Sequence, residues 1–152
     1  LDLNSFKPQE LSNIVWAFAR ARESNPRLFR RVAEHMITLD LNSFEPQDVS
    51  NTIWAFSKAG ECNPSLFNKV ADHILALDTL DAFHPKDCNQ LLWGFAVANI
   101  PHGPLFDRVA AHANQFDFAA MDEQTTEMLM FAYEAAEKSK RQKQGKSGKK
   151  AS

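Results

Sequence analysis

Cysteine and glycine are scarce in this 152-residue chain, which has two of the first and five of the second. Two cysteines are too few for the disulfide framework of a small secreted domain. No apolar run approaches the roughly 18 residues needed to cross a bilayer, so we expect no membrane span. The chain also lacks a glycine-rich phosphate loop, a nucleophile elbow and any metal-type spacing of Cys and His. These absences predict a folded protein that is not an enzyme and needs no metal, cofactor or small-molecule substrate.

The chain repeats itself at a nearly fixed period. The segment FKPQELSNIVWAFARA begins at Phe6 and returns as FEPQDVSNTIWAFSKA from Phe44 and as FHPKDCNQLLWGFAVA from Phe83. The steps are 44−6 = 38 and 83−44 = 39 residues. A degenerate copy of the first half-repeat, MDEQTTEMLMFAYEAA, begins at Met121. Such self-similarity is typical of stacked repeats in which each unit is one supersecondary element.

Each repeat is predicted to be a helical hairpin. Pro8 suits the first turn of a helix, and the acid two residues later faces the positive end of the helix dipole, as a capping group does. A lone hairpin cannot offset the entropy of its own ordering, so the hairpins must stack. We therefore predict an all-α fold, a short α-solenoid over residues 1–137, with repeats at about 1–38, 39–77 and 78–116 and a capping half-repeat at 117–137.

Charge divides the chain into an acidic body and a basic end. Residues 138–152, KSKRQKQGKSGKKAS, hold seven Lys or Arg and no acid, which leaves 17−7 = 10 bases and 19 acids, or −9, in residues 1–137. This composition predicts a disordered basic tail. It also predicts an electrostatic tether for phosphates, formed by Lys138, Lys140, Arg141 and Lys143.

Histidine and tryptophan each recur once per repeat, the histidines at His35, His73 and His112. Stacked repeats would hold the histidines about a repeat apart, so we interpret them as hydrogen-bonded structural residues and not as metal ligands. The tryptophans border the apolar side of the first helix, which favours packing between repeats over base stacking.

The candidate binding residues lie on the polar side of the first helix of each repeat. Amide groups both donate to and accept from the edge of a base, so amides and cations at one height per repeat suit the recognition of one base per repeat. A merely solvated helix face explains the same pattern. The candidates are Gln9, Asn13, Arg20, Gln47, Asn51, Lys58, Lys86 and Gln90.

The segments PQELSNIVWAFARA and PQDVSNTIWAFSKA, each followed by an NPxLFxxVA second helix, resemble the octotricopeptide and heptatricopeptide repeats and the related FAST-kinase-like helical repeats. The resemblance implies an α-solenoid that binds single-stranded RNA in mitochondria or chloroplasts and acts in RNA processing, stability or translation. It also implies that the polar positions of the first helices, those of the candidate residues above, bind the RNA. The RAP domain that often accompanies such repeats does not occur in this sequence.

Two other interpretations remain open. An acidic solenoid surface would suit a protein-interaction scaffold that binds a basic peptide. The chain also begins without Met and within a repeat, so we expect it to be a fragment or processed form, whose repeats end a longer array.

Overall fold

A computed structural model describes residues 2–100, 102–117, 119 and 121–150. Every regular element in these residues is a helix, which confirms the predicted all-α class. The elements are η1 (Leu3–Ser5), α1 (Pro8–Arg20), α2 (Pro26–Thr38), η2 (Leu41–Ser43), α3 (Pro46–Lys58), α4 (Pro64–Ala76), α5 (Pro85–Val97), α6 (Gly103–Ala113) and α7 (Glu123–Lys150), where η marks a 3-10 turn.

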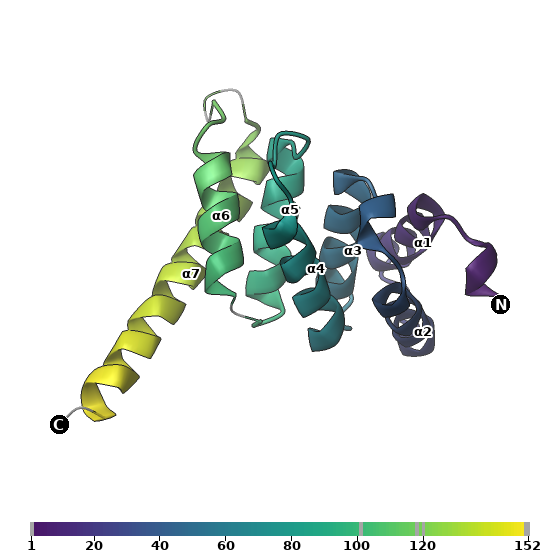
Figure 1. The fold of residues 1–152 in the computed structure, drawn as a ribbon, viewed down its shortest axis with the longest axis horizontal. Coiled ribbons are helices and arrows are strands. Elements are labelled where there is room, and N and C mark those ends of the chain that lie inside the picture. Colours follow the sequence, from purple (N-terminus) through teal and green to yellow (C-terminus); the bar gives the residue numbers. More distant parts are fainter. Residues whose placement is uncertain (1, 101, 118, 120, 151–152) are drawn as a thin grey trace.

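The helices form two layers. In the first layer α1 packs on α3, α3 on α5 and α5 on α7, and in the second layer α2 packs on α4 and α4 on α6. Figure 1 shows this regular advance along the chain, with the two termini at opposite ends of the array. The short helical solenoid predicted from the repeats is therefore confirmed.

Carboxylates cap the starts of the first-layer helices. Glu10 accepts a hydrogen bond from the backbone N–H of Lys7 at 3.0 Å. Asp48 and Asp87 accept from the residues three before them at 3.1 and 3.0 Å. These bonds satisfy backbone donors that a helix leaves unpaired at its start. The acids at this position of each repeat thus have the capping role that their spacing predicts.

The hydrophobic core lies between the two layers. Phe29 of α2 meets Phe56 of α3 edge to face, with ring centroids 5.1 Å apart. Phe67 of α4 and Phe95 of α5 are in contact one unit later, also at 5.1 Å but with the rings tilted at 58°. All four side chains are fully buried. Burial of one such ring contributes about 1.5–3 kcal/mol, so these pairs bind neighbouring repeats together.

Small residues let the first-layer helices approach closely. A Cβ atom added to Gly94 of α5 would lie 2.5 Å from Cγ2 of Ile53 on α3. At the same point the hydroxyl of Ser57 donates to the carbonyl of Gly94 at 2.7 Å. At a different position of the repeat, the hydroxyl of Ser12 on α1 donates to the carbonyl of Asp48 on α3 at 3.0 Å. Close contact along this layer leaves a narrow open surface on α3 and α5, which have a first-layer neighbour on both sides.

A basic residue links consecutive helices of the second layer. Nζ of Lys69 on α4 donates to the carbonyls of Met36 and Ile37 at 3.0 and 2.6 Å, and to that of Leu39. Arg108 on α6, one repeat later, donates in the same way to the carbonyls of Ile74, Leu75 and Leu77. The carbonyls at a helix C-terminus are unpaired and carry partial negative charge, so a cation there stabilises the stack.

Replacing Arg108 by methionine should lower the free energy of unfolding by about 1.5–3 kcal/mol, because the carbonyls at the end of α4 lose a charged donor. Chemical denaturation measures this loss. Arg27→Met, at an exposed position of α2, is the matched control and should change stability by less than about 0.5 kcal/mol. Equal effects of the two substitutions would contradict the role given to Arg108.

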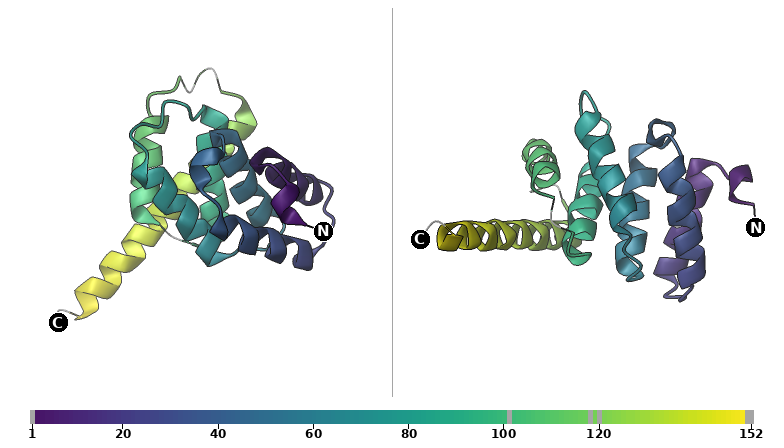
Figure 2. Two further views of the ribbon diagram at one scale, coloured as in Figure 1. Left: turned by 45° about the vertical axis from the view of Figure 1, so that its right-hand side comes forward. Right: turned by 60° about the horizontal axis from the view of Figure 1, so that its bottom comes forward.

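The basic end of the chain differs from its prediction. Residues 138–150 are the continuation of α7, a 28-residue helix, so the predicted disorder is wrong there, while residues 151–152 lie outside the described part. A helix already formed on the body extends without a new nucleation cost, and its Ala, Lys, Arg and Gln residues favour helix. Lys140 adds an ion pair with Asp107 of α6 at 3.0 Å. Figure 2 shows this end of α7 projecting from the array.

Candidate nucleic-acid interface

Helix α3 exposes a single narrow stripe. It is flanked by α1 and α5, and Phe56 contacts Phe29 in the second layer. Apart from Pro46 at its start, the residues that keep accessible surface are Gln47, Asn51, Trp54 and Lys58. The spacing i, i+4, i+7, i+11 places all four on one face of the helix.

The same positions are open on the neighbouring helices. We call this surface the first-layer stripe and define it as these four positions of α3 and the positions of α1 and α5 that match them in the repeat register and keep accessible area. Its members are Gln9, Asn13, Trp16 and Arg20 on α1, Gln47, Asn51, Trp54 and Lys58 on α3, and Lys86, Trp93 and Val97 on α5. Seven of the eight residues predicted to bind RNA therefore lie on one continuous surface.

Gln90 is the exception. Its side chain is 6% exposed, and its Oε1 has no hydrogen-bond partner among the described residues. The prediction that Gln90 lies on the accessible polar side of its helix is wrong. Helix α5 is packed between α3 and α7, and the arc left open runs through Lys86, Trp93 and Val97.

The tryptophans form a ladder along the stripe. Ring centroids lie 6.4 Å apart for Trp16 and Trp54, and 6.3 Å apart for Trp54 and Trp93, with the rings tilted by 38° and 31°. Packing between repeats is thus confirmed as a role of these residues. Each ring also keeps accessible surface, and Phe131, in the same register on α7, is 49% exposed. The ladder therefore leaves part of each aromatic ring accessible on this surface.

The stripe is positive although the body is negative. It carries Arg20, Lys58 and Lys86 and no carboxylate, whereas residues 1–137 together carry −9. Of the three acids of these helices, Asp48 and Asp87 are buried caps at 7% and 5% exposure, whereas Glu10 is an exposed cap outside the stripe positions. The guanidinium of Arg20 lies over the ring of Trp16, 5.3 Å from its centroid. Phosphates approaching the stripe thus meet cations, and the net charge of the body does not describe this surface.

The predicted phosphate tether is partly ordered around the end of the solenoid. Three of its residues, Lys138, Lys140 and Lys143, line a cavity between α7 and the body. Arg141 is exposed, and the lining of that cavity does not include it. Sequence reasoning missed the cavity, because the prediction of disorder placed these lysines in no fixed relation to the body.

One of the recurring histidines, His112, and one of the two cysteines, Cys88, have structural surroundings. Nε2 of His112 donates to the carbonyl of Phe83 at 3.1 Å. Burial raises the pKa of the Cys88 thiol to about 12, so thiolate does not form there near neutral pH. In the described residues, three or more His, Cys, Asp or Glu side chains nowhere gather as metal ligands would, and no helix there has the length and apolar character to span a membrane.

A protein-family model described as RNA-editing substrate-binding complex 6 protein matches residues 4–136. This span is 136−4+1 = 133 of the 152 residues and includes the whole first-layer stripe. A comparison with curated proteins gives no significant match. The match supports an RNA-associated helical family, and it does not specifically support the octotricopeptide, heptatricopeptide or FAST-kinase-like relationship. The chain belongs to the RNA-editing substrate-binding complex 6 protein family.

Proposed function

We propose that this protein binds single-stranded RNA along the first-layer stripe and acts in RNA processing as one component of a multi-protein RNA-editing complex. The observation that carries the proposal is the open surface of α3. Beyond Pro46, that surface consists of two amides, one indole and one ammonium group, those of Gln47, Asn51, Trp54 and Lys58. The family description, which names RNA editing and substrate binding, supports the same function.

Each group on the stripe has a use in binding RNA. The amides of Asn13 and Asn51 can donate to and accept from the edge of an unpaired base. Partly exposed indole rings offer apolar surface on which bases stack. The cations of Arg20, Lys58 and Lys86 can pair with phosphates. The clusters on α1 and α3 are complete, and the one on α5 lacks an accessible amide because Gln90 is buried. Together they correspond to about three nucleotides if each repeat contacts one base.

A site this short gives little sequence discrimination by itself, so partner proteins would supply further contacts. The alternative of a basic peptide as the ligand has less support, because the stripe carries no carboxylate. We propose binding without catalysis and without a cofactor. We also propose a mitochondrial location, with which the family match is consistent, and the chloroplast alternative gains no support from it.

Matched double substitutions test the proposal. Arg20→Gln with Lys58→Gln removes two cations from the stripe, and Arg27→Gln with Arg30→Gln removes two exposed cations from α2. In a salt titration with a fluorescent single-stranded RNA, the stripe variant should bind about tenfold more weakly. Its slope of log affinity against log salt should be shallower by about 1.4, the contribution of two phosphate contacts.

The α2 variant should bind within about twofold of the wild type, since its cations lie in the other layer. Equal losses in the two variants would show that RNA responds only to net charge. That result would contradict binding at the stripe.

A further inference from the structure

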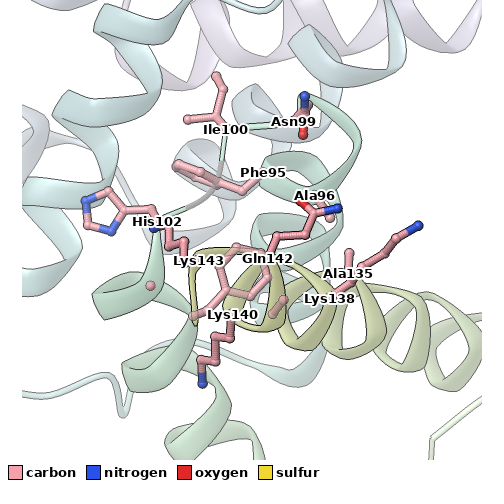
Figure 3. A pocket seen from close by; sticks show the side chains of 13 residues that line it. Phe95, Ala96, Asn99, Ile100, His102, Ala135, Lys138, Lys140, Gln142 and Lys143 are labelled. Carbon is pink, nitrogen blue, oxygen red and sulfur yellow. The ribbon is translucent and has the colours of Figure 1, made fainter. Parts of the chain in front are cut away.

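A cavity of about 360 Å³ lies where α7 leaves the body. It opens between the C-terminal end of α5, the start of α6 and the part of α7 from Ala135 to Lys143 (Figure 3). Phe95, Ile100 and Phe106 give it an apolar floor. Cavities of roughly 300–1,000 Å³ commonly hold small ligands, so this one has room for a planar group.

The rim of the cavity is polar and positive. Lys138, Lys140 and Lys143 contribute three positive charges, and the lining includes no acid. Lys140 pairs with Asp107 at 3.0 Å and with Glu137 at 3.8 Å. Among the described residues, the ion pairs engage neither Lys138 nor Lys143. Those two ammonium groups are therefore available to an anion.

Neutral groups on the rim suit a base. Asn99 and Gln142 bring amides that can donate and accept. Nδ1 of His102 accepts the backbone N–H of Leu105 at 3.2 Å, so Nε2 is the ring nitrogen that can donate to a ligand. The cavity thus combines an apolar floor, hydrogen-bonding groups of both kinds and two cations.

An equivalent cavity two repeats earlier shows that the C-terminal cavity differs in the charge of its lining. It measures about 320 Å³ and lies between α1, α2 and α3. The repeat register relates its Phe18 and Phe29 to Phe95 and Phe106. Its charged lining is balanced, with two cations and two acids, namely Arg22, Lys58, Glu23 and Glu61. The two cavities are thus similar in size and position in the repeat, but only the C-terminal one has a lining with lysines and no acid, and two of its three lysines lie outside the ion pairs of Lys140.

We propose that this C-terminal cavity takes one nucleotide of the bound RNA, with its base against the apolar floor and its phosphates on Lys138 and Lys143. The inference rests on the proposed function. The cavity adjoins the end of the first-layer stripe. Its lining includes Ala96, the residue before Val97 of the stripe. The lining also includes Ala135, which occupies on α7 the repeat position that Val97 occupies on α5. An RNA strand that follows the stripe therefore arrives beside the cavity.

Filling the cavity tests the inference. Ala136→Leu places a larger side chain in the C-terminal cavity, and Ala59→Leu does the same in the neutral one, at the equivalent repeat position. Fluorescence anisotropy with a short single-stranded RNA should show about tenfold weaker binding for Ala136→Leu, the scale on which loss of one base contact acts. Ala59→Leu should stay within about twofold, and circular dichroism checks that both variants fold.

A second pair of variants leaves the apolar floor intact. Lys138→Gln with Lys143→Gln should weaken binding several-fold, and Lys140→Gln, which removes the ion-paired lysine, should weaken it less. RNA carrying 4-thiouridine should crosslink to residues 95–106 or 135–143 in the wild type and lose those crosslinks in Ala136→Leu.

The outcomes separate this inference from the proposed function. In one outcome, Ala136→Leu binds RNA as well as Ala59→Leu does, while the Arg20→Gln, Lys58→Gln variant still binds weakly. The cavity is then not a nucleotide site, and the stripe remains the interface. If a polyglutamate peptide binds the wild type as tightly as RNA does and Ala136→Leu abolishes only peptide binding, the cavity is a site for acidic peptides and the inference is overturned. If none of the variants affects RNA binding, both proposals fail.

Discussion

Replacing Asn13 and Asn51 by aspartate is expected to weaken the binding of single-stranded RNA about 100-fold, because like charges brought together at an interface cost several kcal/mol. Each substitution keeps the shape of the side chain while it removes an amide donor and adds a negative charge. Asn13 is exposed on α1 and Asn51 is partly exposed on α3, so the fold should tolerate both changes. The effect should be largest at low salt, where charge repulsion is least screened.

A control with the same charge change uses Asn68→Asp on α4 and Gln115→Glu just after α6, both at exposed positions. It should cost less than about threefold in affinity, because its carboxylates lie away from the stripe. Affinity is measured by anisotropy, and thermal unfolding shows whether either variant is destabilised. If the control loses as much affinity as the Asn13→Asp, Asn51→Asp variant, the RNA is not held at Asn13 and Asn51.

Trp54→Ala is expected to lower the free energy of unfolding by about 2–4 kcal/mol, a little less than truncation of a fully buried aromatic residue. Trp54 is the middle ring of the ladder and contacts both Trp16 and Trp93. Its loss removes two ring contacts and leaves a gap between three repeats. Urea denaturation followed by circular dichroism gives the change directly.

Trp16→Ala is the comparison, since the ring at the N-terminal end of the ladder meets one other tryptophan. It should cost less than Trp54→Ala by about 1 kcal/mol, the typical value of one aromatic pair. Equal losses of unfolding free energy at Trp16 and Trp54 would show that the ring contacts of the ladder do not stabilise the packing between repeats.

The repeat structure was predictable from the sequence because each repeated residue has a local physical role. Prolines mark helix starts, and the acids at Glu10, Asp48 and Asp87 bond to the backbone N–H groups there. Periodicity also predicts which positions face the same way, so seven of the eight candidate RNA-binding residues lie on one surface. Those features depend on residues within one helix, and a helix has a fixed period.

What the sequence did not reveal depends on contacts between distant residues. The links from Lys69 and Arg108 to the preceding helix of the second layer join residues about 30 positions apart, and the repeat pattern alone gives no reason to single them out. Burial of Gln90 follows from the packing of α5 between two helices. The charge of residues 138–150 suggested disorder, but attachment to the body allows α7 to continue through them.

Selection from a random single-stranded RNA pool tests the central claim most directly. The wild-type chain and the Asn13→Asp, Asn51→Asp variant would each be equilibrated with the pool across a salt series, and the RNA that stays bound would be sequenced. If the stripe recognises bases, the wild type should enrich a short sequence preference that persists as salt rises, and the variant should retain only salt-sensitive binding without enrichment. Equal enrichment by the two proteins, or none by the wild type, would contradict base recognition at the first-layer stripe.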